Sequence, residues 1–238
     1  MKRILLLLFF IVFGLNLQAQ TEKSDKLYFS EALNMHLSKY NSKAEAAYKY
    51  RKFEKAEKLF DTLIDTKLKS TYIDNFKFLT IKRKEIALYD FKKPVYLLTY
   101  ASWCIPGKGE IPALNELAKK YQDKIDFVIL FWDKRETVKE LSKQFDSHIN
   151  VLYVDETKNN HSYVVKNLKH SLGLPTCYLI SGNKQIMDIQ RSVFHPFNIS
   201  KEESFKLNYE SMNSSITNNL IGNPLEPESI KLSAVPPK

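Results

Sequence analysis

Short apolar runs alternate with helical patterns through the middle of the chain, and this alternation constrains the fold most strongly. Val95–Tyr100 is a nearly continuous apolar run, typical of a strand that is covered on both faces. Further strands are predicted at 125–131, 151–154, 174–180 and 185–189, and helices at about 106–121 and 136–145. This order predicts the α/β class, with a mixed central sheet flanked by helices.

Segments of different character flank this region. From about Leu27 to Leu68, apolar residues recur at steps of three and four, which predicts an amphipathic helical hairpin within an N-terminal extension over 20–70. The main domain is expected over 71–221, and its last helix begins at Ser200, where Glu203 completes a capping box. Residues 222–238 combine prolines with polar residues, which predicts a disordered tail.

The first 19 residues have the pattern of a secretory signal peptide. Lys2 and Arg3 precede an apolar run from Ile4 to Leu15, and small and polar residues follow up to Ala19. About 12 apolar residues are too few for a spanning helix, which needs about 20. No cysteine follows the run, so a lipoprotein anchor is not expected. We therefore expect a periplasmic or secreted protein with no stable membrane span after the signal is removed.

Charge and histidine spacing exclude several classes of partner. The formal net charge is +9, and two of these positive charges belong to the predicted signal. Lysines alternate with acidic residues along most of the chain, as on solvated helix faces, so we do not expect a nucleic-acid partner. The five histidines show no pairing at ligand spacing. We therefore expect neither a metal nor a cofactor.

A single cysteine lies between the first core strand and the helix predicted after it, in the sequence Trp103-Cys104-Ile105-Pro106-Gly107. A helix start at Pro106 would suit a residue without an N–H. The unpaired amides and dipole of that helix would then lower the pKa of Cys104 and make it a nucleophile. A dithiol enzyme needs a second thiol three residues on, and Gly107 occupies that place.

The chain contains one further cysteine, Cys177, in the strand predicted at 174–180. Counting by two along that strand places its side chain on the same face as Pro175, the face expected under the helix after Cys104. Two readings stay open. Cys177 is either a relocated resolving cysteine or a buried free thiol that fills the core.

Three sequence elements together resemble the thioredoxin superfamily, and within it the exported TlpA/ResA-like redoxin group, here with CxxG in place of CxxC. The elements are the Trp-Cys-x-Pro half-motif at 103–106, Glu110 with Pro112, and the cis-proline motif Leu174-Pro175-Thr176. The resemblance covers roughly 72–220 and implies a thioredoxin-like fold. The residues that end the signal, Leu17 to Gln20, resemble signal peptides of Bacteroidetes.

The resemblance also implies roles for individual residues. Cys104 would be the catalytic nucleophile, and Glu110 would correspond to a carboxylate that helps to move a thiol proton. A cis Pro175 would place the backbone of Leu174 beside the thiol, where an extended substrate can pair with it. The substrate-binding residues implied in this way are Trp103, Ile105, Pro106, Leu174 and Pro175.

Three functions are compatible with this pattern. The first is a monothiol oxidoreductase in which Cys104 reacts with protein or small-molecule thiols and disulfides, contributing to redox homeostasis in the cell envelope. The second is a redox-silent module that binds peptides or acts as a scaffold through the cis-proline groove. The third is a thiol peroxidase, although Ala101 occupies the position where peroxiredoxins carry threonine.

Overall fold

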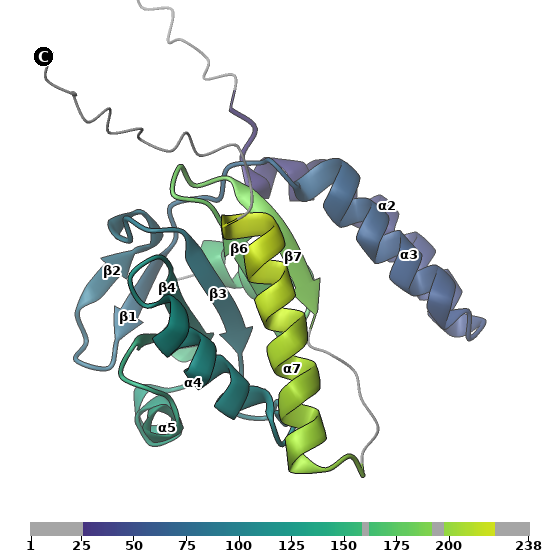
Figure 1. Ribbon diagram of the computed structural model, residues 1–238. Coiled ribbons are helices and arrows are strands. Elements are labelled where there is room, and N and C mark those ends of the chain that lie inside the picture. Colours follow the sequence, from purple (N-terminus) through teal and green to yellow (C-terminus); the bar gives the residue numbers. More distant parts are fainter. Residues whose placement is uncertain (1–25, 159–161, 192–197, 222–238) are drawn as a thin grey trace, which may run out of the picture.

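A seven-stranded mixed sheet with helices on both faces forms the body of the computed structural model, which describes residues 26–158, 162–191 and 198–221 (Figure 1). The strands are β1 (Lys77–Thr80), β2 (Glu85–Ala87), β3 (Val95–Tyr100), β4 (Asp126–Phe131), β5 (Ile149–Tyr153), β6 (Thr176–Ile180) and β7 (Ile186–Arg191). The helices are α2 (Phe29–Lys49), α3 (Phe53–Leu63), α4 (Glu110–Tyr121), α5 (Arg135–Leu141), α6 (Ser162–Val164) and α7 (Lys201–Ile216). The predicted signal peptide, the predicted tail, His161 and His195 lie outside the described residues.

The strand order β2-β1-β5-β4-β3-β6-β7 confirms the predicted mixed sheet. Strands β3, β4 and β5 are parallel neighbours, whereas β6 pairs antiparallel with β3 and β7 pairs antiparallel with β6. A parallel β3-α4-β4 unit is thus followed, after β5, by an antiparallel β6–β7 hairpin and then by α7. This arrangement is the thioredoxin-like fold that the sequence predicts.

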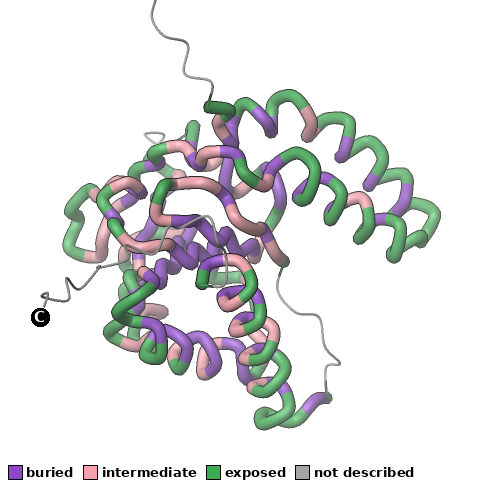
Figure 2. Tube along the Cα trace, turned by 45° about the horizontal axis from the view of Figure 1, so that its top comes forward, coloured by how far each residue is buried: buried purple, intermediate pink, exposed green. Residues whose placement is uncertain are grey.

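Alternate residues of the central strands divide the core into two halves. Tyr96 and Leu98 of β3 point to the face covered by α4, α5 and α7, whereas Val95 and Leu97 point to the opposite face. All six residues of β3 are buried, which explains why its sequence is almost continuously apolar. In Figure 2, residues coloured as buried are concentrated at the centre of the molecule.

The predicted N-terminal helical hairpin is present as α2 and α3, and it packs on the second face of the sheet. Phe29, at the start of α2, is fully buried and meets Tyr178 of β6 edge to face, with ring centroids 5.8 Å apart. Leu68, in the π turn (Ile64–Leu68) that follows α3, is also fully buried. The two ends of the hairpin that lie next to the domain are therefore part of its core.

One boundary next to the cysteine motif differs from the prediction. The helix after β3 begins at Glu110, so Pro106 lies in the preceding loop and not in the first helical turn. The last helix does begin as predicted, because the Ser200 hydroxyl accepts a 3.0 Å hydrogen bond from the backbone N–H of Glu203. The loop of residues 101–109 therefore needs contacts other than helical hydrogen bonds to hold its shape.

Candidate active site

Cys104 lies in the loop between β3 and α4, at the carboxyl end of a central strand. Its backbone N–H donates a 2.9 Å hydrogen bond to the carbonyl oxygen of Ala101, which closes a tight turn. Cys104 is half-buried and packs against the core face that α4 covers. Its neighbours Trp103 and Ile105 are 66% and 94% exposed. The thiol is thus bordered by two large apolar side chains that face solvent.

The expected low pKa of Cys104 is wrong. Partial burial raises the pKa of the thiol, a hydrogen bond with the backbone of Ala101 acts in the opposite direction, and the charges of Asp133 and Glu110 raise it further. The helix that was expected to stabilise the thiolate begins six residues later, at Glu110, so Cys104 does not lie in its first turn. The resting Cys104 is therefore a protonated thiol at neutral pH.

Asp133 holds the start of the cysteine loop. Its carboxylate accepts hydrogen bonds from the backbone N–H of Ser102 at 2.8 Å and from the Ser102 hydroxyl at 2.5 Å. The parallel register pairs Tyr100 with Phe131, so the loops that leave β3 and β4 start side by side. The sequence prediction assigned Asp133 no role at the site, although adjacent parallel strands bring their carboxyl ends together.

The end of the same loop is held by the start of α7. The backbone N–H of Gly109 donates a 3.0 Å hydrogen bond to the hydroxyl of Ser204, and Lys108 donates to the carbonyl of Ile199 at 3.3 Å. A Cβ atom on Gly109 would lie 2.0 Å from the backbone nitrogen of Phe205. Only glycine allows this close approach between the start of α4 and the start of α7.

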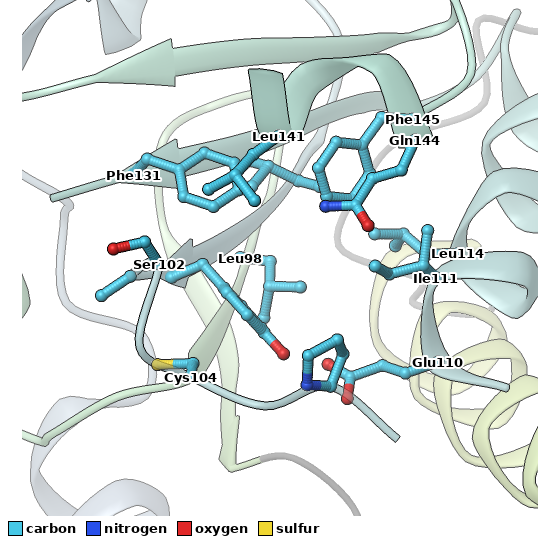
Figure 3. A pocket seen from close by; sticks show the side chains of 14 residues that line it. Leu98, Ser102, Cys104, Glu110, Ile111, Leu114, Phe131, Leu141, Gln144 and Phe145 are labelled. Carbon is cyan, nitrogen blue, oxygen red and sulfur yellow. The ribbon is translucent and has the colours of Figure 1, made fainter. Parts of the chain in front are cut away.

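Glu110, a predicted catalytic residue, is buried beside the loop. Its side-chain carboxylate accepts a 3.1 Å hydrogen bond from the backbone N–H of Gly107. Glu110 and Cys104 line the same cavity of about 160 Å³, in which Figure 3 shows Cys104 at one edge and Glu110 further along the wall. The remaining wall is mostly apolar and includes Leu98, Ile111, Leu114, Phe131, Leu141 and Phe145.

The cavity also contains a polar group that sequence reasoning missed. The hydroxyl of Tyr100 is buried and has no hydrogen-bond partner among the described residues. Burial is the largest cause of a strongly raised pKa at Tyr100, and the nearby charges of Glu110 and Cys104 add to it. Tyr100 is the last residue of β3, so the alternation of the strand toward the α4 face was the signal that could have identified it.

The predicted cis peptide bond is confirmed at Leu174–Pro175. Thr176, the next residue, pairs with Thr99 in the antiparallel β3–β6 register, and the Thr99 hydroxyl donates a 3.0 Å hydrogen bond to its carbonyl. Extending that register places Pro175 opposite Tyr100, where the cysteine loop begins. The cis-proline loop and the cysteine loop therefore leave the same end of the sheet, as the prediction required.

Cys177 lies deep in the sheet. As predicted, its side chain packs on the face that α4 covers, where it shares a core cluster with Tyr96 and Leu98. Burial raises the pKa of the Cys177 thiol to about 12. The two cysteines are not bonded to each other, and Cys177 lines a smaller cavity, separate from that of Cys104, in which Glu110 also takes part. Cys177 is thus a buried, protonated thiol.

Two features are absent from the part of the chain that the structure describes. No three His, Cys, Asp or Glu side chains of residues 26–158, 162–191 and 198–221 are grouped so that they could hold a metal ion. Across the same part of the chain, no helix has the length and apolar character needed to cross a membrane.

The curated proteins that resemble this chain are named as oxidoreductases or thioredoxin-like proteins. Thiol-disulfide oxidoreductase ResA of Bacillus cereus is 33% identical over 117 residues, which are 48% of this chain and 64% of ResA. Thioredoxin-like protein YneN of Bacillus subtilis is 28% identical over 119 residues, which are 48% of this chain and 66% of YneN. The chain therefore spans slightly less than two thirds of the length of these relatives.

The structural comparison agrees with the topology. An uncharacterized conserved protein from Geobacillus kaustophilus superposes with a TM-score of 0.50 at 15% identity, covering 69% of this chain and 88% of that protein. At this identity the likeness supports the fold alone. The sequence match to a family is more extensive, since residues 62–189, more than half of the chain and including both cysteines, match the AhpC/TSA family. The chain belongs to the AhpC/TSA family of thioredoxin-like proteins.

Proposed function

We propose that this protein is an exported thiol–disulfide oxidoreductase that acts through the single nucleophilic cysteine Cys104. The observation that carries the proposal is the position of the thiol. It is half-buried at the sheet end from which the cis Leu174–Pro175 loop also leaves, and it is bordered by exposed Trp103 and Ile105. The ResA relative is named as a thiol-disulfide oxidoreductase, which supports the same chemistry.

The reaction is a pair of exchange steps. Cys104 loses its proton, and the thiolate attacks one sulfur of a substrate disulfide, so that a mixed disulfide forms and the other substrate sulfur leaves as a thiolate. That thiolate takes up a proton. An external thiol then attacks the substrate sulfur of the mixed disulfide, and Cys104 leaves and is protonated again. The substrate has exchanged one thiol partner for another, and the protein returns unchanged.

The second step needs an external thiol because the chain offers none in the right place. Gly107 has no side chain, and the buried Cys177 has a pKa of about 12 and lies on a different cavity from Cys104. We therefore assign Cys177 to packing and not to resolution. A leaving thiol of high pKa leaves slowly. Since the pKa of Cys104 is raised, we expect the mixed disulfide to be long-lived until an external thiol of lower pKa reacts with it.

We assign Glu110 to proton transfer at Cys104. Both side chains line the cavity of about 160 Å³, which is large enough to hold water. A proton that leaves the sulfur can reach the carboxylate through such a water. Glu110→Gln separates this role from a purely electrostatic one, because loss of the charge alone would lower the pKa of Cys104 and speed its reaction at neutral pH. Proton transfer predicts that the variant reacts more slowly.

The exposed apolar side chains define how a substrate would bind. Trp103 and Ile105 offer apolar surface on the two sides of the sulfur, and the half-buried Pro106 continues that surface. The backbone of Leu174 is available for pairing with an extended peptide. We therefore favour a protein or peptide disulfide with apolar residues next to its cysteine.

Mass spectrometry of the mixed disulfide tests the proposal. The folded chain is treated with an apolar peptide disulfide and with 2-hydroxyethyl disulfide, and adducts at the two cysteines are timed separately. We expect Cys104 to form the adduct much faster than Cys177. Trp103→Ala and Ile105→Ser should slow the peptide reaction and leave the small disulfide unaffected. An adduct that forms at Cys177 first, or at neither cysteine, contradicts the proposal.

A redox-silent module that binds peptides is the second candidate, and the raised pKa of Cys104 favours it. In that case Cys104→Ser would bind peptides as well as the original chain, whereas a variant at Pro175 would not. A thiol peroxidase is a third reading. It predicts that the chain consumes hydrogen peroxide faster than free cysteine does, with oxidation of Cys104 to sulfenic acid.

Export rests on the predicted signal peptide at residues 1–19. Cleavage after Ala19 would leave Gln20 as the first residue, and N-terminal sequencing of the protein from an envelope fraction would detect it. In that compartment the proposed exchange would act on disulfides of exported proteins or small molecules and contribute to redox homeostasis.

A further inference from the structure

The end of the α2–α3 hairpin that lies farthest from the sheet carries an unusual surface, which we call the hairpin tip and define as residues 48–55. Its sequence is Tyr-Lys-Tyr-Arg-Lys-Phe-Glu-Lys, with three aromatic, four basic and one acidic side chain. All eight residues are exposed. Figure 1 shows this end of the hairpin projecting away from the sheet and from α4 and α7.

The packing of the hairpin explains why the tip stands free. At the base, large side chains such as Phe29, Leu33 and Leu68 are buried in the core of the domain. Near the tip, the buried residues are the alanines Ala44, Ala47 and Ala56, which hold the two helices against each other. In Figure 2, most residues at this end of the hairpin have the colour of exposed residues. The large side chains at the tip therefore contribute nothing to the core of the domain.

The aromatic side chains at the tip are exposed despite their apolar area. Tyr48, Tyr50 and Phe53 are 46%, 68% and 62% exposed. The rings of Tyr48 and Phe53 contact each other, with centroids 6.3 Å apart, so the aromatic surface is continuous across the turn. Burial of such rings against a partner would be favourable by about 25 cal/mol for each Å² of apolar surface removed from water.

The basic side chains alternate with these rings. Lys49, Arg51, Lys52 and Lys55 form no ion pair with any carboxylate in the part of the chain that the structure describes. Some lysines elsewhere are paired, as Lys77 is with Glu85 at 2.8 Å on the β1–β2 hairpin. The tip therefore presents unneutralised positive charge together with exposed aromatic rings.

This combination matches the surface of an anionic lipid bilayer. Aromatic rings are enriched at the level of the lipid headgroups, and basic residues are attracted to anionic headgroups by about 1 kcal/mol each near the surface. A convex hairpin end can enter a headgroup layer, whereas a single nucleic-acid strand is typically held in a groove. We propose that the hairpin tip, residues 48–55, docks on the surface of an anionic lipid membrane.

The proposal assigns the hairpin a role of its own, independent of the thiol chemistry. The bound molecule would hold its sheet and the Cys104 loop at a distance from the lipid, because the tip is the part that projects. Docking requires no spanning helix, and the described residues contain none. The exchange reaction of Cys104 in solution needs no vesicle, so each idea can fail while the other stands.

Co-sedimentation with vesicles tests the docking. The chain from residue 20 onward, the form that export is predicted to leave, is mixed with vesicles of phosphatidylglycerol and phosphatidylcholine and with vesicles of phosphatidylcholine alone. We expect binding to the anionic vesicles to be at least about tenfold stronger and to weaken as salt is raised. Equal binding to both kinds of vesicle, or binding to neither, would overturn the proposal.

Two tip variants and a matched control locate the contact. The variants are Lys49→Gln with Arg51→Gln and Lys52→Gln, and separately Tyr48→Ser with Tyr50→Ser and Phe53→Ser. The control is Lys82→Gln with Arg83→Gln and Lys84→Gln, which removes the same charge from another exposed turn that lacks aromatics. We expect each tip variant to lose at least about tenfold in vesicle binding and the control to stay within about twofold.

Further measurements separate other occupants of the tip. Circular dichroism and thermal melting verify that every variant is folded. Tighter binding of a labelled single-stranded oligonucleotide than of anionic vesicles would assign the tip to nucleic acid and overturn the proposal. A dimer that forms with the original chain and is lost in the aromatic tip variant would assign the tip to contact with a second copy of the chain. That result would also overturn the proposal.

Discussion

The Ser102 backbone N–H and hydroxyl donate to the two carboxylate oxygens of Asp133 at 2.8 and 2.5 Å, which ties the loop after β3 to the loop after β4. The same carboxylate acts on the thiol two residues further along, because its negative charge raises the pKa of Cys104. Partial burial is the largest cause of the raised pKa of Cys104, and Asp133, which orders the cysteine loop, adds to it.

Neutralising Asp133 should make Cys104 more reactive. In Asp133→Asn the charge that opposes the thiolate is lost, so the pKa of Cys104 falls and alkylation by iodoacetamide at pH 7 becomes severalfold faster. One charged hydrogen bond to Ser102 is weakened, and the free energy of unfolding should fall by about 1 kcal/mol. Asp61→Asn, on the exposed side of α3, is the control and should change neither quantity. A slower alkylation would contradict this account.

Replacing two glycines, Gly109 and Gly173, by alanine should lower the free energy of unfolding by different amounts. In Gly109→Ala the new Cβ would lie 2.0 Å from the backbone of Phe205, so α4 and α7 must separate, and we expect a loss of about 3 kcal/mol or more. Gly173 has a φ of +86° and open space around its Cα. In Gly173→Ala the free energy of unfolding should therefore fall by only about 1–2 kcal/mol, the cost of a left-handed conformation for a residue with a side chain. Urea denaturation of both variants measures the difference, and equal losses would count against the close approach at Gly109.

The sequence predicts the fold well where the buried pattern is local. Strand β3 is fully buried, and its continuous apolar run was sufficient to identify it. The cap of α7 was equally visible, because Ser200 and Glu203 make the predicted contact within three residues.

The site could be predicted in its residues but not in its electrostatics. The cis Pro175 and the half-buried Cys104 follow from local motifs, and both are where the sequence predicts them. The predicted start of α4 was wrong, because Pro106 suits a first helical turn. The start of α4 is instead fixed by the hydrogen bond of Gly109 with Ser204, 95 residues away in the sequence. Asp133 lies near Cys104 because β3 pairs with β4, and this long-range contact is not visible in the local sequence.

Cys177 should make the protein less stable in alkali. Its pKa rises from 9.0 to about 12 on folding, so between these values the unfolded chain releases a proton that the folded chain keeps. The contribution of this thiol is fully present below pH 9 and is lost as the pH rises toward 12, at about 1.4 kcal/mol per pH unit.

Replacing Cys177 isolates that effect. Cys177→Ala has no thiol to ionise, so its free energy of unfolding should fall less steeply between pH 9 and pH 10 than that of the original chain. Burial, which the variant keeps, is the largest cause of the raised pKa of Tyr96, so most of the Tyr96 contribution is common to both chains, although the contact with Cys177 that adds to that shift is lost. Urea denaturation at pH 8, 9 and 10 measures both slopes. Parallel slopes would mean that Cys177 reaches solvent in the folded protein.

Restoring the missing thiol should change the class of chemistry. In Gly107→Cys a second cysteine stands three residues after Cys104, and the backbone hydrogen bond from residue 107 to Glu110 is kept, because it uses the main-chain N–H. The new thiol can attack the mixed disulfide within the molecule, so release no longer waits for an external thiol. We expect an intramolecular disulfide under oxidising conditions, seen by mass spectrometry as the loss of two hydrogens. We also expect insulin reduction with dithiothreitol to be about tenfold faster or more.

Gly107→Ser is the control, because its side chain has nearly the size of cysteine without the thiol, and it should behave like the original chain. If the thiols at residues 104 and 107 of Gly107→Cys both stay free in an oxidised glutathione buffer, the loop holds Cys104 in a position that does not support thiol exchange with its neighbour.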